Sequence, residues 1–205
     1  MNTISIYGFG SVGQKLAKLF SDAGRTVIIC SKDGSSGREE YQTASFAEGA
    51  KLADAVALAI PFTAAQELLI KHADELTGTT IIECTNPLNE DWSPLLLGEN
   101  TSGAEEIANA LPNAKVVKAF NTIFADVMPK ERHDRAGQAI TAFVCGSDDH
   151  SKNDVLKLVV DCGFAPVNAG SLKSARYLEA MAHLNIEIAV GQGGSTNAAF
   201  LYHQA

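Results

Sequence analysis

Short apolar runs alternate along the chain with stretches in which apolar residues recur at helical spacing. Five runs predict strands: TISIY at 3–7, TVIIC at 26–30, DAVALAI at 54–60, TTIIEC at 79–84 and KVVKA at 115–119. The stretch after the first run carries apolar residues at helical spacing from Val12 to Ala23, which favours a helix. Apolar strands that alternate with helices are typical of a parallel sheet covered on both faces. The pattern therefore predicts an α/β fold.

The first predicted strand ends in a glycine-rich turn, GFGSVG at 8–13, which fits the spacing G-x-G-x-x-G and opens the first helix. Gly8 permits a tight turn, Gly10 leaves room for close approach of a pyrophosphate, and Gly13 allows the helix to pack on the strand. Free N–H groups at the helix N-terminus attract phosphates. We therefore predict a Rossmann-type doubly wound parallel sheet with a dinucleotide site at this turn.

The residues after the second strand distinguish the two nicotinamide dinucleotides. NAD sites place an acidic residue there for the ribose 2′-hydroxyl, whereas NADP sites accommodate the 2′-phosphate with a cation. Ser31 and Lys32 come first, ahead of Asp33 in a turn-forming Asp-Gly pair, and Arg38 follows a glycine-serine loop. This order favours NADP(H), with a solvated loop as the alternative role of Lys32 and Arg38.

Polar and turn-forming residues follow the next three strands. Pro61 cannot continue a strand ladder and fixes a turn, while Asn86 and Asn121 follow the fourth and fifth strands. Because the carboxyl ends of parallel strands share the ligand edge of an open sheet, we expect both amides to bind a carboxamide or a ribose hydroxyl. Turn formation is the alternative role for each asparagine.

The pattern changes in the last third of the chain. A sixth strand is expected at 138–145, with its polar end at Asp148 on the same edge, before a helix at 151–162 and a short strand at 165–168. A long helical run, 172–190, is apolar on much of its circumference and needs burial on two sides.

We therefore expect two parts of unequal size. Residues 1–170 would form the dinucleotide-binding domain, and residues 171–205 a small C-terminal helical extension. The apolar helix of this extension predicts a homodimer, and the extension is expected to contribute to the acceptor site. Its glycine-rich tail would either order against a ligand or partner or remain mobile.

Composition and charge exclude several classes of function. A net charge of −8 without a run of Lys or Arg argues against nucleic-acid or anionic-membrane partners. The four cysteines lie far apart with no His cluster beside them, so neither a zinc site nor a redox dithiol is indicated. No signal-peptide pattern and no stretch approaching a membrane span is present. We expect a cytoplasmic protein with reduced thiols and no metal.

No group of residues stands out as a catalytic acid, base or nucleophile, so the catalytic residues stay unknown. Lys173 is a candidate base, although a solvated lysine is the commoner role, and His183 and Asn185 fit interface polar residues better than catalysts. Trp92, the single tryptophan, could cover a cleft or anchor its loop. Hydride transfer needs none of these groups, because the protein mainly brings two rings together and excludes water.

Seven motifs, taken in order, carry a family resemblance. They are GFGSVG, ICSK, AIPF, ECTNPL, VKAFNTI, VCGSDD and GFAPVNAGSLKSARYLEAMAHL, and they run from Thr3 to about Leu184. Together they resemble the NADP oxidoreductase, coenzyme F420-dependent family. The resemblance implies a Rossmann domain with a C-terminal helical extension, a homodimer, and hydride transfer between NADP(H) and the deazaflavin ring of coenzyme F420. A similar domain of six-transmembrane ferric reductases passes hydride from NADPH to a flavin.

The same resemblance assigns residues to the cofactor site. The residues that would hold the pyrophosphate are Gly8, Phe9, Gly10, Ser11 and Val12. Those implied for the 2′-phosphate are Ser31 and Lys32. Those bordering the adenosine and ribose would be Ala59, Ile60, Pro61 and Phe62. The nicotinamide side would be lined by Asn86, Pro87 and Asn121.

Two functions from different classes remain open. The first is an NADP(H)-dependent oxidoreductase that transfers hydride to a small-molecule acceptor, either coenzyme F420 or a flavin. The second is an NADPH-binding sensor or partner module without turnover of its own, because a fold does not determine a function. The chain has no room for the large helical second domain of β-hydroxyacid dehydrogenases, so a planar acceptor suits it better than a small hydroxy acid.

Overall fold

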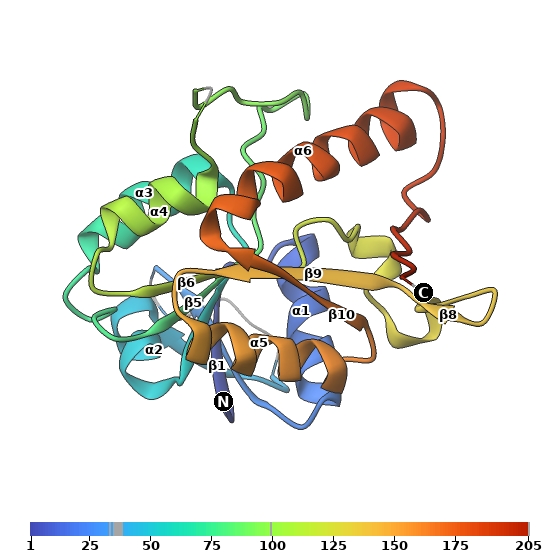
Figure 1. Ribbon diagram of the computed structural model, residues 1–205. Coiled ribbons are helices and arrows are strands. Elements are labelled where there is room, and N and C mark those ends of the chain that lie inside the picture. The colour runs from blue at the N-terminus through green and yellow to red at the C-terminus, as the bar shows by residue number, and fades with distance from the viewer. Residues whose placement is uncertain (33, 35–38, 99, 205) are drawn as a thin grey trace.

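The computed structural model describes residues 1–204 except 33, 35–38 and 99. Its main sheet has the strand order β10-β9-β6-β5-β4-β1-β2-β3 (Figure 1). The strands are β1 (Thr3–Tyr7), β2 (Thr26–Ser31), β3 (Gln42–Ser45), β4 (Ala55–Leu58), β5 (Thr80–Glu83), β6 (Lys115–Lys118), β9 (Thr141–Gly146) and β10 (Ala165–Ser171). Strands β1 to β6 run parallel in the doubly wound order 3-2-1-4-5-6, which confirms the predicted fold class.

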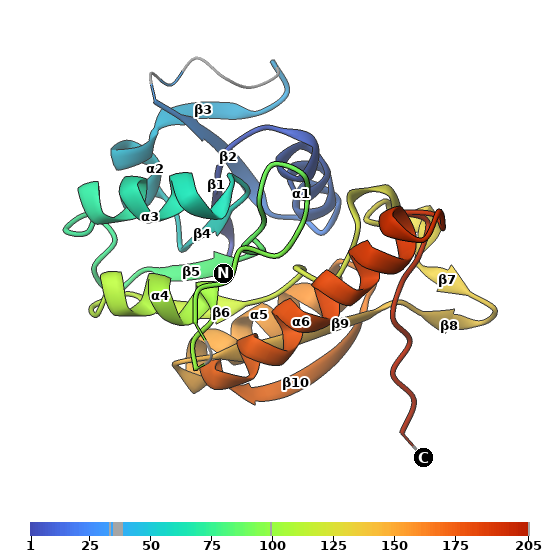
Figure 2. The same ribbon diagram turned by 90° about the horizontal axis from the view of Figure 1, so that it is seen from above.

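Helices cover both faces of the sheet (Figure 2). The helices are α1 (Ser11–Asp22), α2 (Phe46–Leu52), α3 (Phe62–Lys71), α4 (Gly103–Ala110), α5 (Asp149–Asp161) and α6 (Ala175–Ile186). Side chains of α1 and α5 pack into one apolar cluster with the sheet, and those of α2, α3 and α4 pack into a second cluster on the other face. The apolar strands are thus buried on both sides, as their composition predicted.

The sixth predicted strand differs from its expectation in two ways. It is divided into β8 (Gln138–Ala139), which pairs with β7 (Asp134–Arg135) in a hairpin, and β9. Strand β9 is antiparallel to β6, with Gly146 opposite Val117. The prediction that its polar end shares the ligand edge is therefore wrong, and Asp148 instead accepts a hydrogen bond from the backbone N–H of Ser151 at the start of α5.

Strand β3 was not predicted from the sequence. It has the polar composition QTAS and lies at the edge of the sheet, parallel to β2, with Ser31 opposite Ser45. An edge strand carries little apolar signal because it has a neighbour on one side only. Ser45 also caps α2, accepting from the backbone N–H of Glu48 at 3.3 Å.

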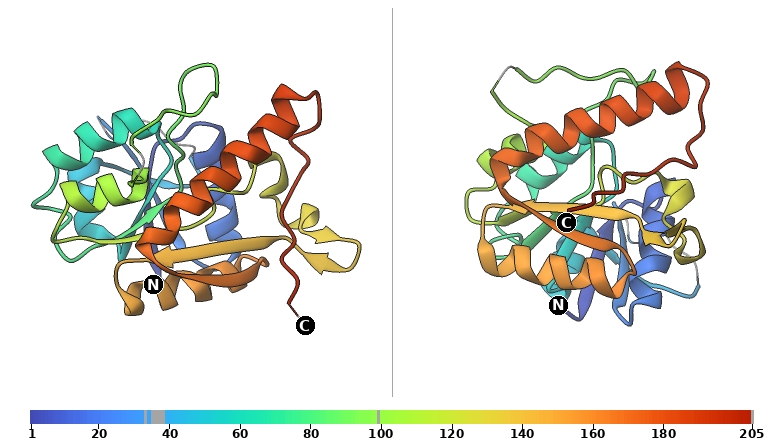
Figure 3. Two further views of the ribbon diagram at one scale, coloured as in Figure 1. Left: turned by 45° about the horizontal axis from the view of Figure 1, so that its top comes forward. Right: turned by 45° about the vertical axis from the view of Figure 1, so that its right-hand side comes forward.

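The long helical run was predicted correctly. A short 3-10 turn (Leu172–Ser174) leads into α6, and a π-helical turn (Glu187–Gly191) continues it. Helix α6 crosses the carboxyl side of the parallel strands, and the loop between β5 and α4 rises on that same side (Figure 3). The segment after α6 returns to the sheet, where the backbone N–H of Thr141 donates to the carbonyl oxygen of Phe200 at 3.0 Å.

The four cysteines are free thiols and all are buried. Burial raises the pKa of the Cys30 thiol to about 11, so that it is protonated at neutral pH. In the part of the chain that the structure describes, no helix combines the length and the apolar character needed to cross a membrane.

Candidate functional site

The glycine turn after β1 has the geometry that dinucleotide binding requires. Gly8 has a φ angle of 102°, and a Cβ atom added there would lie 2.7 Å from the carbonyl oxygen of Ala59. A Cβ at Gly13 would lie 2.3 Å from the carbonyl oxygen of Gly8. A Cβ at Gly10 would meet no atom within 4 Å, so this position faces open space. The turn therefore leaves an opening directly before the helix, where a phosphate can approach the backbone.

Helix α1 presents its N-terminus to that opening. Gly10 occupies the N-cap position without a side-chain capping bond, and the first turn contains no acidic residue. The backbone N–H groups of this turn and the positive end of the helix dipole therefore suit an anion. Ser11 at the helix start is exposed, while Phe9 and Val12 are half-buried against the core. These observations fit the pyrophosphate of a dinucleotide.

The segment after β4 lies across the turn, at the point where the strand order reverses. The backbone N–H of Ala59 donates to the carbonyl oxygen of Tyr7 at 2.9 Å, and Ile60 contacts the Gly8 position. Pro61 is exposed and occupies the N-cap position of α3 without a side-chain capping bond, whereas Phe62 is buried. In doubly wound sheets ligands bind in the crevice at this reversal.

A surface pocket of about 390 Å³ lies beyond the carboxyl ends of β2 and β3. Lys32 lines it together with Ser45 and Phe46 at the start of α2, and with Lys71 and His72 at the end of α3. The sequence analysis missed Lys71 and His72, because they are far from the glycine turn along the chain. Two lysines at one pocket suit a phosphate group. Arg38, the other predicted cation, lies outside the described residues.

Asn86 and Asn121 are brought together by β5 and β6. The side-chain amide of Asn121 donates to Asn86 Oδ1 at 2.9 Å, and the amide of Asn86 donates to the backbone oxygen of Asn121 at 2.8 Å. Phe120 has a φ angle of 64°, which is strained for a bulky residue and turns the chain at this point. The amide of Asn121 also donates to the backbone oxygen of Leu178 on α6 at 3.0 Å. Within the described residues, Asn121 Oδ1 is buried without a hydrogen-bond partner.

Pro87 has a packing role beside this pair. A Cβ added at Gly103, the first residue of α4, would lie 2.9 Å from Pro87 and 3.0 Å from Phe62. The two buried side chains therefore hold the start of α4 against the loops that follow β4 and β5. The backbone oxygen of Pro87 lies 3.1 Å from Nε2 of His183, which links the same segment to α6.

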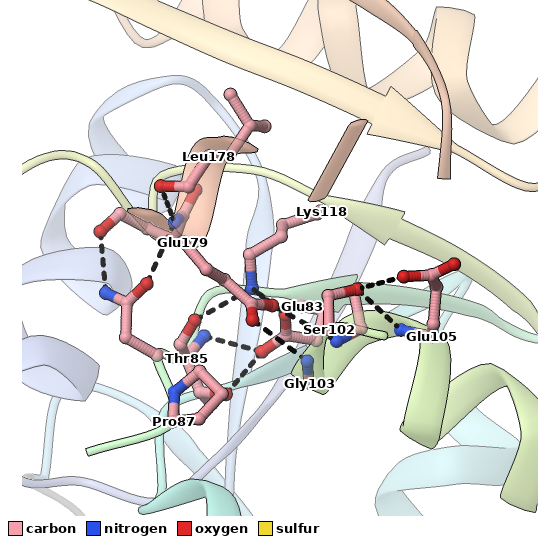
Figure 4. A network of polar contacts seen from close by, with 12 residues as sticks. Glu83, Thr85, Pro87, Ser102, Gly103, Glu105, Lys118, Leu178 and Glu179 are labelled. Atoms are coloured by element: carbon pink, nitrogen blue, oxygen red, sulfur yellow. Dashed lines mark hydrogen bonds and ion pairs between the residues drawn. The ribbon is translucent and has the colours of Figure 1, made fainter. Parts of the chain in front are cut away.

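Three charged residues, Glu83, Lys118 and Glu179, form a buried triad (Figure 4). Glu83 and Lys118 are opposite each other at the ends of β5 and β6, both with 0% of their surface exposed, and Glu179 reaches them from α6. The Lys118 ammonium bonds to the Glu83 carboxylate, to Glu179 Oε1 at 2.9 Å and to the backbone oxygen of Thr85 at 2.9 Å.

The triad fixes the charge of Lys118. Burial by itself lowers the pKa of the lysine, but attraction to Glu83 and Glu179 and the hydrogen bonds to both carboxylates outweigh it and raise the pKa. Lys118 is therefore a charged ammonium. The sequence analysis did not identify the triad, although a Glu and a Lys at the ends of adjacent apolar strands are an unusual pattern.

The other residues weighed from the sequence have ordinary surroundings. Lys173 is exposed before α6, which agrees with a solvated lysine, and Asn185 is buried. Trp92 is about half exposed, on the loop between β5 and α4. Among the described residues, no group of three or more His, Cys, Asp or Glu side chains could hold a metal ion.

Residues 3–87, which include the glycine turn and Asn86, match the model of a family described as NADP oxidoreductase coenzyme F420-dependent. The resemblance to this family is confirmed. Metalloreductase STEAP3 of Rattus norvegicus is 28% identical over 181 residues, which are 87% of this chain and 36% of that protein. The chain thus spans about a third of the length of this relative.

Solved structures extend the likeness to nearly the whole chain. The crystal structure of a proposed F420-dependent NADP-reductase from Arthrobacter sp. FB24 has a TM-score of 0.87 and 27% identity, covering 98% of this chain and 99% of that one. Plasmodium falciparum pyrroline carboxylate reductase, solved with NADP bound, has a TM-score of 0.59 at 15% identity and covers 94% of this chain and 69% of that one. The latter match shows the shared fold only. The Rossmann-type fold and the relation to NADP-dependent oxidoreductases are thus confirmed.

Proposed function

We propose that the protein is an NADP(H)-dependent oxidoreductase that transfers hydride between the nicotinamide ring and a deazaflavin such as coenzyme F420, or a flavin-like acceptor. The observation that carries the proposal is the opening at Gly10 in front of an uncapped helix N-terminus, within a segment that matches the oxidoreductase family. The dinucleotide, when bound, supplies the hydride.

The order of the loops along the carboxyl edge suggests how the chain would hold the dinucleotide. Lys32 and the pocket beside α3 would bind the phosphorylated adenosine end, and the turn at Gly8 to Val12 would bind the pyrophosphate. Asn86 and Asn121, two strands further, would bind the carboxamide of the nicotinamide. These loops follow β2, β1 and then β5 and β6, so an extended dinucleotide would cross the strand-order reversal.

The chain's own contribution to the reaction would be positioning and exclusion of water. The asparagine pair fixes the ends of β5 and β6 relative to α6, because Asn121 also binds Leu178. Helix α6 and the loop after β5 stand on the side where an acceptor would approach. Direct transfer between carbon atoms requires alignment of two rings and no protein nucleophile, in accord with the lack of a predicted catalytic residue.

We further propose that residues 171–205 act as a dimer and acceptor-site element on a dinucleotide-binding domain of residues 1–170. Large apolar side chains on α6 and its continuation are exposed, and they are Tyr177, Leu184, Ile188 and Val190. Tyr177, Leu184 and Ile188 recur at intervals of seven and four along the chain, which places them on one face. A second copy of the chain would remove this face from water.

The test is a titration of the purified protein with NADPH and NADH, followed by addition of coenzyme F420, FMN or a ferric chelate under anaerobic conditions. We expect selective NADPH binding and loss of nicotinamide absorbance with the deazaflavin or the flavin. Tight NADPH binding without oxidation by any of these acceptors would instead support the sensor or partner module. Failure to bind either nucleotide would refute the proposal.

A further inference from the structure

The buried triad of Glu83, Lys118 and Glu179 adjoins the asparagine pair through the backbone. Thr85, whose carbonyl oxygen accepts from Lys118 at 2.9 Å, directly precedes Asn86. Leu178, whose carbonyl oxygen accepts from Asn121 at 3.0 Å, directly precedes Glu179. The charged groups are therefore linked to the two asparagines through Thr85 and Leu178, which Figure 4 labels beside the triad.

The hydrogen bonds of the triad define its net charge. Lys118 directs its ammonium group at three acceptors, namely Glu83, Glu179 Oε1 and the Thr85 oxygen, which accounts for all three N–H donors. A neutral amine would leave one of these acceptors without its donor. Lys118 thus contributes one positive charge.

Both glutamates are ionised, because each of their four oxygens accepts from a group that can only donate. Glu83 Oε1 accepts from the backbone N–H of Thr85 at 2.7 Å, and Oε2 accepts from Lys118. Glu179 Oε1 accepts from Lys118, and Oε2 accepts from the backbone N–H of Gly103 at 2.9 Å. A carboxylic O–H on Glu179 would have no acceptor among these partners, and on Glu83 it would replace the hydrogen bond that the Thr85 hydroxyl donates to Oε1 at 2.5 Å. Two carboxylates and one ammonium leave one negative charge.

The surroundings reduce this charge without reversing it. Gly103 and Ala104 open α4, and the positive end of a helix dipole is equivalent to about half an elementary charge. Glu105 on α4 and Arg176 on α6 form a bidentate ion pair with each other, so their charges offset. Because the triad is buried, mobile ions screen it weakly.

We propose that the triad makes this site favour the oxidised dinucleotide, whose nicotinamide ring is positively charged, over the reduced one, whose ring is neutral. This inference rests on the proposed function, which sets the nicotinamide against Asn86 and Asn121. A negative charge that adjoins the asparagine pair attracts the cationic ring and does not attract the neutral one. The bound reduced cofactor is consequently a stronger hydride donor than the free one.

The experiment measures the dissociation constants of NADP⁺ and NADPH for the unmodified protein and for Glu179→Gln and Glu83→Gln. Each substitution removes one negative charge. We expect each substitution to lower the ratio of the NADPH dissociation constant to the NADP⁺ dissociation constant by about tenfold. This change is equivalent to a shift of about 30 mV in the reduction potential of the bound cofactor, a two-electron couple. Glu179 is on α6 and Glu83 is on β5, so a purely structural effect would differ between the two variants.

A charge-conserving double variant supplies the control. Lys118→Met combined with Glu83→Gln removes the ion pair, while the backbone N–H groups of Gly103 and Ala104 at the start of α4 continue to stabilise the single charge of Glu179. Its ratio should stay within about twofold of that of the unmodified protein. The inference would be overturned if the ratio of dissociation constants were unchanged in both single variants. It would also be overturned if the ratio fell as far in the double variant as in the single variants.

Measurements on the unmodified protein keep the inference testable if the variants do not fold. NADP⁺ should bind more tightly than NADPH, and the preference should persist at high salt because the triad is buried. Tighter binding of NADPH than of NADP⁺ would contradict this inference and leave the proposed function standing. Failure of both nucleotides to bind would refute the proposed function and this inference together.

Discussion

Asn121 and Asn86 lock the ends of two neighbouring strands together. The Asn121 amide donates to Asn86 Oδ1 at 2.9 Å, and the Asn86 amide donates back to the Asn121 backbone oxygen at 2.8 Å. Phe120, in its strained conformation, directs the chain into this arrangement. The strain and the unpartnered Asn121 Oδ1 are typical of a binding site rather than of a turn that serves only to reverse the chain.

Replacement of Asn86 tests the nicotinamide side of the site. Asn86→Ala should weaken the binding of NADPH by about 1–2 kcal/mol, because the nicotinamide carboxamide loses one hydrogen-bonding partner. Binding of 2′-phospho-ADP-ribose, which lacks the nicotinamide, should be unchanged in a calorimetric titration. Asn113→Ala, an exposed asparagine at the other end of β6, serves as the control. Equal losses for the fragment and the whole dinucleotide would argue against this placement.

Gly10 and Gly13 allow binding to be separated from folding. An alanine at Gly10 would meet no neighbour, so Gly10→Ala should retain the melting temperature while it loses most NADPH affinity. An alanine at Gly13 would collide with the Gly8 carbonyl oxygen, so Gly13→Ala should lower the melting temperature. Thermal unfolding and NADPH titration of both variants provide the comparison. Unimpaired NADPH binding by Gly10→Ala would place the pyrophosphate elsewhere.

The 2′-phosphate assignment depends on Lys32. Lys32→Ala should weaken the binding of NADPH by about 1–3 kcal/mol, because a charge-assisted hydrogen bond to the 2′-phosphate is lost. The binding of NADH, which lacks this phosphate, should stay nearly unchanged. Lys51→Ala, in the last turn of α2, removes the same charge away from the pocket and is the matched control. If NADPH and NADH weaken equally, Lys32 does not bind the 2′-phosphate.

The sequence predicted the parts of the fold and site that depend on local pattern. The six strands β1, β2, β4, β5, β6 and β10 and the helix pattern followed from apolar runs and spacing, and the roles of Gly8 and Gly13 agree with the contacts found. Arg38 and the homodimer stay predictions. The reversal of β9 was missed because an apolar run has the same composition in either direction.

Features that depend on long-range contacts were not predictable. Glu179 is 96 residues from Glu83 along the chain, and only the packing of α6 over the sheet brings them together. Lys71 joins Lys32 at one pocket because α3 lies beside the start of α2. A helix-surface lysine has the same sequence signature whether or not it lines a pocket, so no local pattern could distinguish it.

The ion pair between α4 and α6 makes a pH-dependent contribution to stability. The hydrogen bonds from Arg176 lower the pKa of the Glu105 carboxyl below its ordinary value. Because the folded pKa is the lower one, the stabilisation is present above the ordinary carboxyl pKa of about 4.3 and is lost as the pH falls through the folded value.

The Glu105→Gln variant should therefore have a lower melting temperature than the unmodified protein at neutral pH. The difference between the two melting temperatures should disappear in strong acid. Differential scanning calorimetry across this range measures the gap. Glu90→Gln, at an exposed glutamate on the loop after β5, removes the same charge as a control. A gap that is independent of pH would mean that the ion pair does not contribute through its charge.

The most direct test of the account is transfer of deuterium from NADPH labelled at the hydride position of its ring to coenzyme F420, analysed by mass spectrometry of the reduced product. The account predicts that NADPH is oxidised and that the label is retained in the deazaflavin, because hydride passes directly between carbon atoms. Bound NADPH that is not oxidised, or a reduced product carrying solvent hydrogen in place of the label, would contradict it.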